Sequence, residues 1–289
     1  MQVVPPEDLT VVSNTGDDEE FFGLRVSPDI DIVIYTLAGA VDAEKGWGLA
    51  GETYHALDAL ARFGYETWFH LGDGDLATLA HRTQLLRAGA TLSEATRSIV
   101  DAFGLRLTLL PVSNDRIRTL VETDAGTLSF QEYFVKRRTE DAVRAVRFDG
   151  IDRASAAPGV LDALLNADIV AIAPSNPVVS IGPVLAVAGV RDALRETAAN
   201  VVAVSPIIGG KTVKGPADRM MASLGMTPTA AGVAQAYADF LDVLVIDETD
   251  HALAGAVEAA GVRCVVAPTI MRGPAEKRAL AEAALRAVQ

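Results

Sequence analysis

The run Asp168-Ile-Val-Ala-Ile-Ala173 is the first of four apolar stretches that decide the fold. Three more of strand length follow it: Val201-Val-Ala-Val204, Val243-Leu-Val-Ile-Asp247 and Val262-Arg-Cys-Val-Val-Ala267. Runs without polar alternation are typical of strands buried on both faces, as in a parallel sheet covered by helices. Stretches with helical spacing lie between or beside them: Gly159–Asn166, Thr229–Phe240, Thr249–Ala260 and Ala275–Ala287. This alternation predicts an α/β, Rossmann-like fold, with a mostly parallel sheet and helices on both faces.

The first half of the chain alternates less regularly. Short runs predict strands at Leu9–Val12, Thr67–Leu71 and Arg106–Val112. Ser27-Pro28 places an N-cap residue before a first-turn proline and so predicts a helix that reaches Leu37. Helical spacing predicts a second helix over Asp75–Ala88, and the capping box Thr91-Leu-Ser-Glu94 begins a third.

A predicted β-hairpin interrupts this alternation of strands and helices. Arg118–Glu122 and Thr127–Phe134 flank Thr-Asp-Ala-Gly, in which Gly126 suits a positive φ. The Arg-rich stretch Lys136–Arg147 lacks a clear period, so we expect it to be an exposed connection. The sequence therefore predicts a single domain over residues 1–289, with an appended lobe at about residues 110–150.

Charge and composition exclude several classes of function. With 25 Lys+Arg against 38 Asp+Glu, the net charge is −13, which argues against general binding to nucleic acid or anionic membranes. The single cysteine, Cys264, excludes an internal disulfide framework. No apolar run is long enough to span a bilayer, and no signal peptide opens the printed sequence. We therefore expect a cytoplasmic protein.

Polar groups follow the apolar runs, where an open parallel sheet binds its ligands. Ser175, Asn176 and Ser180 come after the first run and offer hydroxyl, amide and backbone N–H groups to a phosphate or a polar ring. An Asx turn that caps a helix would use the same residues. The loop Ser205–Pro216 follows the second run, with Lys211 and Lys214 beside its glycines. It either approaches an anion closely or is a mobile surface loop, and it lacks P-loop spacing.

Acidic residues near the N-terminus form a third candidate site. Asn14, Asp17 and Asp18 follow a strand, while Asp29 and Asp31 open the next helix. Oxygen ligands from two segments suit Mg²⁺, although acidic loops in a protein of this charge are often only solvated. In the turn Leu71–Thr78, the alternatives for Asp73 and Asp75 are ligand binding and helix capping. The four histidines lack metal-ligand spacing, and no Gly-x-Ser-x-Gly elbow occurs.

Several of these motifs together resemble one enzyme family, in order over nearly the whole chain. They are Ser13-Asn-Thr-Gly-Asp-Asp18, Ser27-Pro-Asp-Ile-Asp31, Gly46-Trp-Gly48, Leu71-Gly-Asp73, Gln131-Glu-Tyr-Phe134, Ser175-Asn-Pro-Val-Val-Ser-Ile-Gly-Pro183, Val201-Val-Ala-Val-Ser-Pro-Ile-Ile-Gly-Gly210 and Lys214-Gly-Pro216. The chain is similar to the CofD family, the 2-phospho-L-lactate or phosphoenolpyruvate transferases of deazaflavin coenzyme F(420) biosynthesis. The resemblance implies that a phospho-lactyl or phosphoenolpyruvyl group moves from a guanosine diphosphate-linked donor to the ribityl hydroxyl of the deazaflavin FO, with release of GMP.

The resemblance also implies roles for individual residues. Asp17 and Asp31 would be the catalytic residues that bind Mg²⁺ or the acceptor hydroxyl, and the Ser205–Gly215 loop would hold the nucleotide with Ser175 and Asn176. A homodimer is expected. The candidate substrate-binding residues are Asn14, Asp29, Asp73, Ser175, Asn176, Ser180, Ser205, Gly209, Gly210, Lys211, Lys214 and Gly215.

Two departures from the family pattern leave an alternative open. The family begins with a strand and a Gly-Gly-x-Gly-Gly/Thr turn, which we expect this chain to lack because it starts at Met1-Gln-Val-Val-Pro-Pro. The family's Gly-Asp-Arg-Asp turn has Gly74 in place of the arginine, and Leu79 stands where a histidine is expected. The alternative is a non-catalytic nucleotide-binding paralogue. A Rossmann oxidoreductase is disfavoured because no Gly-x-Gly-x-x-Gly follows a predicted strand.

Overall fold

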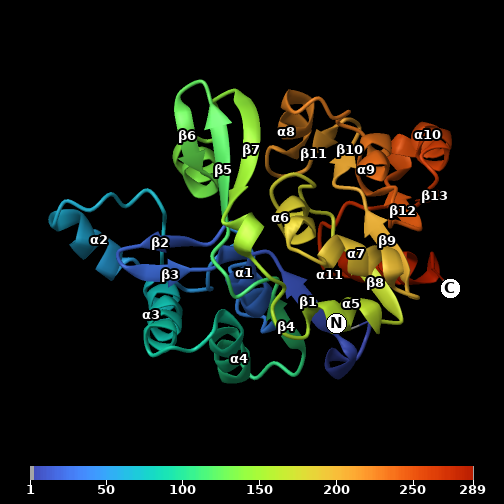
Figure 1. The fold of residues 1–289 in the computed structure, drawn as a ribbon. Coiled ribbons are helices and arrows are strands. Elements are labelled where there is room, and N and C mark those ends of the chain that lie inside the picture. The colour runs from blue at the N-terminus through green and yellow to red at the C-terminus, as the bar shows by residue number, and fades with distance from the viewer. Residues whose placement is uncertain (1–2, 289) are drawn as a thin grey trace.

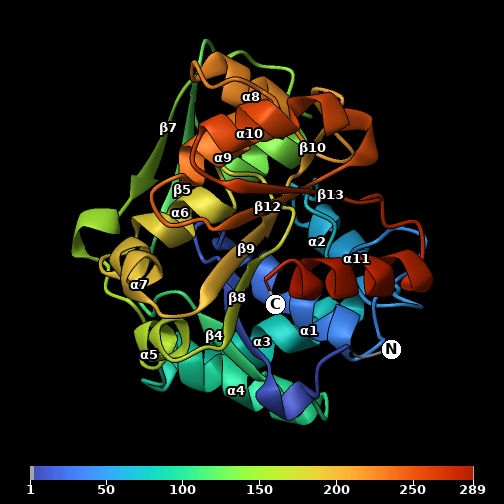
Figure 2. The same cartoon turned by 90° about the vertical axis from the view of Figure 1, so that its right-hand side faces the viewer.

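A four-stranded parallel sheet forms the centre of the second half of the molecule. The computed structural model describes residues 3–288. The strands are β8 (Ile169–Ile172), β9 (Asn200–Val204), β12 (Val243–Ile246) and β13 (Arg263–Val266), in the order β13-β12-β9-β8 (Figure 2). Each of the four predicted apolar strands is confirmed. Only the two inner strands β9 and β12 are buried nearly throughout, while the outer two are partly exposed.

Helices cover both faces of this sheet, as predicted. Alternate side chains point to opposite faces of a strand, so Val201 and Ala203 pack on one side and Val202 and Val204 on the other. The first face is covered by α8 (Ala217–Ser223), α9 (Ala230–Tyr237) and α10 (Ala254–Ala259). The second is covered by α11 (Pro274–Arg286), which lies on the side of the sheet opposite α8, α9 and α10 (Figure 2).

Two further strands form a separate parallel sheet. β1 (Thr10–Ser13) pairs with β4 (Thr108–Pro111). Helices α1 (Pro28–Leu37) and α4 (Leu92–Ala102) cover one face, and α5 (Val160–Leu165) and α7 (Val190–Glu196) cover the other. The α/β class with parallel strands is therefore confirmed, and within residues 3–288 the parallel strands are divided between two sheets.

An antiparallel sheet extends away from the parallel strands (Figure 1). It consists of β5 (Arg118–Thr123), β6 (Gly126–Ser129) and β7 (Val143–Asp149), with β5 in the middle. The predicted hairpin is confirmed, and Gly126 has a φ of +117°. The exposed connection predicted over Lys136–Arg147 is wrong, because most of its second half is strand β7 with Val143 buried.

Two other sequence predictions are corrected. Thr67–Leu71 has no strand partner and is irregular. The strand predicted over Thr127–Phe134 ends at Ser129, and a short helical segment, Glu132–Lys136, follows it. There the Ser129 N–H donates to the Glu132 carboxylate at 3.0 Å and the Ser129 hydroxyl accepts from the Glu132 N–H at 3.2 Å, so the chain turns into a helix.

The remaining elements connect these layers. Helix α4 begins at the predicted Thr91–Glu94 capping box. The other elements are the hairpin β2 (Glu19–Phe21) and β3 (Leu24–Val26), α2 (His55–Arg62), α3 (Asp73–Arg87), α6 (Ile181–Ala186), β10 (Ile207–Ile208), β11 (Lys211–Thr212), and the helical turns Pro6–Asp8, Ile151–Arg153 and Glu248–Leu253. Within residues 3–288, no helix is both long and apolar enough to pass through a bilayer.

Candidate functional site

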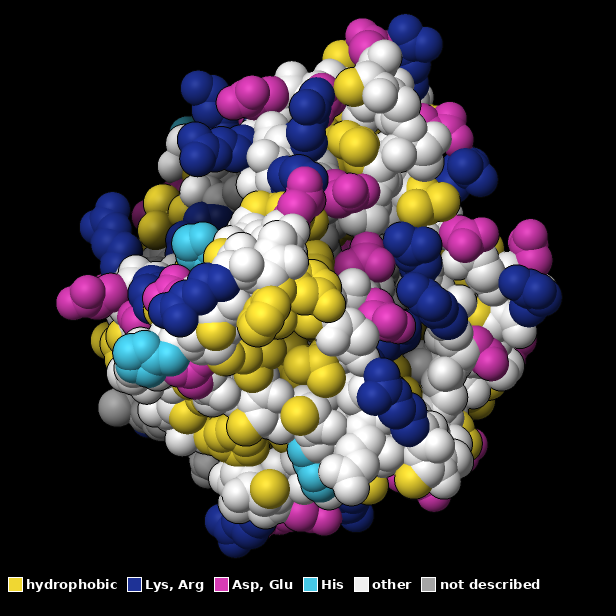
Figure 3. Space-filling view, turned by 90° about the vertical axis from the view of Figure 1, so that its left-hand side faces the viewer, with side chains coloured by type: hydrophobic (Ala, Val, Ile, Leu, Met, Phe, Trp, Pro, Cys, Tyr) yellow, Lys and Arg dark blue, Asp and Glu magenta, His cyan; other side chains and the backbone are white. Residues whose placement is uncertain are grey.

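A cavity of about 1310 Å³ lies where segments from both parallel sheets meet. Its wall includes Asp17 after β1, Ser175 after β8, Ser205 after β9 and Thr269 after β13. These are the carboxyl ends of the strands, where open α/β sheets bind ligands. Hydrophobic side chains gather near the centre of one face of the molecule, bordered by charged residues (Figure 3).

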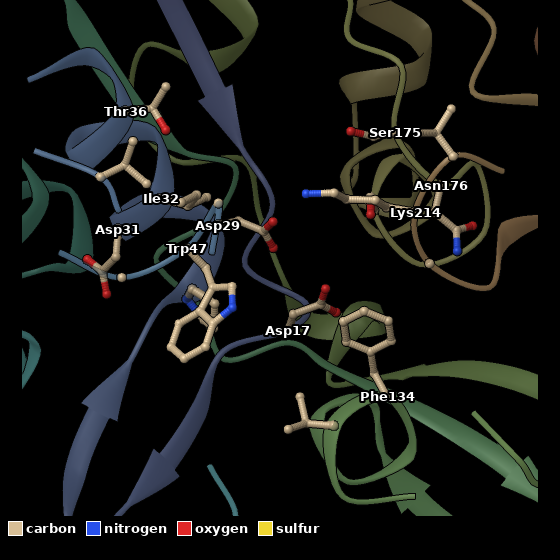
Figure 4. Close-up of a pocket in the computed structure, with 18 of the residues that line it drawn as sticks. Asp17, Asp29, Asp31, Ile32, Thr36, Trp47, Phe134, Ser175, Asn176 and Lys214 are labelled. Atoms are coloured by element: carbon tan, nitrogen blue, oxygen red, sulfur yellow. The ribbon is translucent and has the colours of Figure 1, made fainter. Parts of the chain in front are cut away.

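Two carboxylates, Asp17 and Asp29, lie together in this cavity (Figure 4). Asn14 joins the segments that carry them. Its Oδ1 accepts from the Gly16 N–H at 2.7 Å, and its Nδ2 donates to Asp29 Oδ2 at 3.0 Å. Asn14 itself is buried and does not line the cavity, so its role here is to orient Asp29.

The carboxylates of Asp17 and Asp29 carry little compensation for their charge. Burial, reinforced by the negative charge of Asp29, raises the pKa of Asp17 well above its usual range. Burial also raises the pKa of Asp29 to about 6, against the hydrogen bond from Asn14. Among residues 3–288, Asp17 Oδ1 is buried without a hydrogen-bond partner. An uncompensated carboxylate pair of this kind suits a divalent cation.

Asp31 is engaged elsewhere. Both of its carboxylate oxygens accept from the guanidinium of Arg82, one of them at 3.0 Å, and Arg82 is fully buried. Asp31 lines the cavity wall, but its carboxylate points away from Asp17 (Figure 4). A second buried ion pair, Arg25 with Asp18, lies in the same part of the chain. Asp17 therefore lies beside Asp29 in the cavity, whereas the carboxylate of Asp31, the other residue named by the sequence prediction, is paired with Arg82.

The carboxyl group of Asp75, which also lines the cavity, is expected to make the stability of the protein depend on pH. It accepts a hydrogen bond from the Gly72 N–H at 3.2 Å and is 8% exposed, and burial raises its pKa from 3.8 to about 6. A raised carboxyl pKa means that ionisation destabilises the folded state, so this cost grows as the pH rises from about 4 and is complete above about 6. Asp75→Asn is expected to increase the free energy of unfolding by about 1–3 kcal/mol at pH 8 and by little near pH 4.

Denaturant titrations at the two pH values measure this difference. Asp73→Asn is the matched control, because the hydrogen bonds to Asp73 lower its pKa and the control should destabilise the protein at pH 8. Equal effects of Asp75→Asn at both pH values would contradict the prediction.

Serine and asparagine side chains form the polar part of the wall. Ser175, Asn176, Ser180 and Ser205 all line the cavity. Asn176 Oδ1 accepts from the Val178 N–H at 2.9 Å, which makes the Asx turn that the sequence left as an alternative. Its Nδ2 lies 3.6 Å from the sulfur of Met220 and is not bonded to an oxygen acceptor. Asn176 can therefore form this turn through its Oδ1 and still offer its Nδ2 to a ligand.

Only part of the glycine-rich loop reaches the cavity. Lys214 and Gly215 line it, whereas Gly209, Gly210 and Lys211 do not. The Gly209 N–H donates to both carboxylate oxygens of Asp250 at 3.1 and 3.0 Å, so the glycine pair serves the turn between β10 and β11. Lys214 reaches into the cavity from the side opposite Asp29 (Figure 4).

Asp73 does not line the cavity, although Leu71 and Asp75 of the same turn do. The Asp73 carboxylate accepts from Thr53 Oγ1 at 2.5 Å and from the backbone N–H groups of His55 and Ala56, so it caps helix α2. Gly74 occupies the place of the family's arginine, and its N–H donates to Glu52 Oε2 at 2.8 Å. A Cβ at Gly74 would lie 2.8 Å from Glu52 Oε1, which leaves no room for a larger side chain without rearrangement.

The site also contains aromatic side chains to which the sequence analysis assigned no role. Trp47 and Phe134 line the cavity and are 44% and 40% exposed. Phe134 stacks on Phe130, with the ring centroids 5.5 Å apart. Both Trp47 and Phe134 belong to motifs quoted for the resemblance, but nothing in their local spacing showed that they line the same cavity as Asp17 (Figure 4).

Cations of the cavity wall were also missed, among them Arg138. Arg272 and Lys277 line the cavity, from the loop after β13 and the first turn of α11. The sequence interpretation ended the strand at Ala267 and began the helix at Ala275, without a role for the residues between.

Comparison with known proteins gives one consistent result. The family model described as 2-phospho-L-lactate transferase CofD matches residues 2–267. A phosphoenolpyruvate transferase of Streptomyces griseus subsp. griseus is 44% identical over 290 residues, which cover 98% of this chain and 91% of the relative. A 2-phospho-L-lactate transferase of Methanosarcina mazei is 38% identical, with 99% of this chain and 94% of the relative covered.

A solved structure has a similar fold. A Bacillus halodurans protein described as a member of the UPF0052 family superposes with a TM-score of 0.59 at 16% sequence identity. The superposition covers 96% of this chain and 90% of that one. At this identity, the likeness concerns the fold alone.

Proposed function

The chain belongs to the CofD family of transferases, and from this premise we propose that it transfers a phospho-lactyl or phosphoenolpyruvyl group to a deazaflavin. The proposed donor is a guanosine diphosphate-linked phospho-acid, and the proposed acceptor is the ribityl hydroxyl of FO. GMP is the other product. The reaction would contribute to the biosynthesis of coenzyme F(420). We also propose that two copies of the chain form a homodimer.

One observation carries this proposal. Asp17, which is buried, and Asp29, which is half-buried, lie in a single cavity of about 1310 Å³ that also contains exposed aromatic rings and a wall of serine, asparagine and lysine. A flat ring system, a phosphate chain and an attacking hydroxyl therefore have complementary groups within one enclosure. A cavity of this volume has room for two small molecules at once.

The aromatic side suits the acceptor. Trp47 and Phe134 offer flat apolar surface beside Asp17, and aromatic rings favour offset stacking on other ring systems. A deazaflavin that stacks there would leave its ribityl chain in the polar part of the cavity, near the carboxylates. Asp17, whose Oδ1 has no partner within the described residues, can accept the hydrogen bond of the attacking hydroxyl.

Asp17 and Asp29 fit a bound Mg²⁺. Among residues 3–288 there is no cluster of three or more Asp, Glu, His or Cys side chains for a metal, so two carboxylates and the oxygens of the donor phosphates would complete the coordination. When bound, Mg²⁺ would neutralise charge on the phosphoryl oxygens and on the departing phosphate.

Residues of the chain would position the two reactants. Lys214 and the polar groups of Ser175 and Asn176 would hold the diphosphate so that the acceptor oxygen approaches phosphorus in line with the departing oxygen. The new O–P bond forms as the bond to GMP breaks, and the hydroxyl proton passes to a carboxylate or to water. Positioning and charge stabilisation dominate such a step, so no histidine base is required.

GMP formation tests the proposal directly. The full chain is incubated with FO, Mg²⁺ and either the lactyl or the enolpyruvyl donor, and GMP and the deazaflavin that carries the transferred phospho-acid group are quantified. We expect equimolar formation of both products with at least one donor. Binding of guanosine diphosphate without binding of FO and without turnover would instead support the non-catalytic paralogue.

A further inference from the structure

One continuous segment, residues 130–139, supplies much of one side of the cavity wall. We call it the strap. It follows β6 directly, and five of its residues line the cavity: Phe130, Gln131, Phe134, Val135 and Arg138. Gln131 Nε2 also donates to the backbone carbonyl of Asp17 at 3.4 Å. The strap is therefore in direct contact with the residue that we propose to accept the hydrogen bond of the attacking hydroxyl.

The far end of the strap has an unfavourable backbone conformation. Arg138 and Thr139 have φ values of +50° and +58°, and among the other non-glycine residues between 3 and 288 only Phe22 has a positive φ. A β-branched residue such as Thr139 rarely adopts this left-handed region, because its side chain crowds its own backbone. Without support, such a conformation would be populated only to about one tenth or less. Other contacts must therefore hold it in place.

Arg219 of α8 makes contacts of this kind. Its Nη1 donates to the carbonyl oxygen of Thr139 at 3.0 Å, and its Nη2 donates to Thr139 Oγ1. Thr139 is buried, and its own N–H donates to the Tyr133 carbonyl at 2.9 Å. Two bonds from one rigid, planar group fix both the peptide that follows Thr139 and its side chain.

The middle of the strap is held by a weaker contact with the first half of the chain. Lys136 Nζ donates to Glu66 Oε2 at 2.6 Å and lies 5.6 Å from the centroid of the Trp68 ring. The side chains of Lys136 and Glu66 are 37% and 70% exposed, and exposed ion pairs contribute little to stability. Loss of the Arg219 contact is therefore the change that we expect to release the strap.

We propose that Arg219 is a positioning residue, which keeps Phe134 and Arg138 in the cavity wall by holding Thr139 in the left-handed conformation. This inference rests on the proposed function, in which Phe134 offers a stacking surface to the acceptor. Arg219 does not line the cavity itself, so it acts through the strap and not on a substrate. Released from Arg219, the strap would leave the wall for most of the time. The acceptor would then lose binding surface in the ground state and the transition state alike.

Replacement of Arg219 with Met tests this role, because it removes both hydrogen bonds and keeps a side chain of similar length. The KM for FO and the Kd from a titration of FO fluorescence should each rise by about tenfold, with kcat within about threefold of the wild type. Trypsin should cleave the full chain after Lys136, Arg137 or Arg138 about tenfold faster, because an opened strap is accessible to the protease. Mass spectrometry of the fragments identifies the cleaved bond.

Glycine at position 139 provides a specific rescue. Glycine adopts the left-handed region without a steric cost, so Arg219→Met/Thr139→Gly should bind FO within about threefold of the wild-type affinity. A merely structural role of Arg219 would not be relieved by this change. Arg191→Met is the matched control, since Arg191 also donates to a backbone carbonyl, that of Ala236 at 3.0 Å, and does not line the cavity. It should leave both FO binding and cleavage of the strap unchanged.

Either wild-type FO affinity or wild-type resistance to trypsin in Arg219→Met would overturn the positioning role. A double variant that is folded by circular dichroism but binds FO as weakly as Arg219→Met would also overturn it. If the wild type itself does not bind FO, the acceptor in the proposed function is wrong. The trypsin rates then decide the role of Arg219 alone: faster cleavage of Arg219→Met supports it, and equal rates overturn it.

Discussion

Replacing Asp17 with Asn is expected to lower the rate of GMP formation by at least about 10²–10³-fold, the usual cost of removing one preorganised charge-stabilising group. Asp17 and Asp29 lie together in the cavity and neither forms a salt bridge within residues 3–288, so we expect no neighbour to take over the role of Asp17. Asp29→Asn should act in the same direction. Steady-state assays with saturating donor and FO measure the change in kcat.

The same substitution should stabilise the protein in the absence of metal. Asp17 is 7% exposed, so its charged carboxylate is poorly hydrated, and the negative charge of Asp29 repels it. Replacing Asp17 with a neutral Asn removes both unfavourable contributions. We therefore expect a higher Tm for Asp17→Asn than for the wild type without Mg²⁺. Adding Mg²⁺ should raise the Tm of the wild type and leave that of the variant nearly unchanged.

Asp162→Asn, at an exposed position of α5, is the control and should behave like the wild type in both measurements. A lower Tm for metal-free Asp17→Asn would show that the carboxylate has a structural role. Full Mg²⁺ stabilisation of this variant would place the cation elsewhere.

Sequence reasoning located the parallel strands because their apolar runs are continuous. Val243–Ile246 is buried at every position and contains no polar residue, so its apolar run is continuous. β7 was missed because Arg144 and Arg147 make it resemble a solvated connection. In the folded sheet those arginines pair across the strands with Asp124 and Glu122. A strand whose charges are compensated only by its neighbours cannot be recognised from its own residues.

The two carboxylates proposed to bind Mg²⁺ show what sequence reasoning could have found. Asp29 and Asp31 both lie in the first turn of α1, and at 3.6 residues per turn their side chains are about 200° apart. They cannot both face Asp17. Helical geometry alone therefore allowed only one of them, but the choice between them depended on Arg82, which lies 51 residues away from Asp31 in the sequence. Arg272 was missed for a similar reason, since only the tertiary fold brings its loop to the cavity.

Arg82 is the subject of the second large prediction. It is fully buried, and the Asp31 side chain with which it pairs is 10% exposed. Removing one partner of a buried ion pair leaves an uncompensated charge in the interior, which typically costs about 3–5 kcal/mol. Arg82→Met fills much of the same volume, so we expect the free energy of unfolding to fall by about that amount. Chemical denaturation followed by circular dichroism measures it.

The double variant Arg82→Met/Asp31→Leu separates lost charge compensation from lost packing. Replacing both partners by apolar groups is often neutral, so most of the stability should return. Arg278→Gln, which breaks an exposed pair with Glu282, should cost no more than about 1 kcal/mol. If the double variant is as unstable as Arg82→Met, the guanidinium stabilises this region through its other contact, the hydrogen bond from Nη1 to the Arg25 carbonyl at 3.5 Å. Recovery of stability would instead show that Asp31 serves mainly to neutralise the buried charge of Arg82.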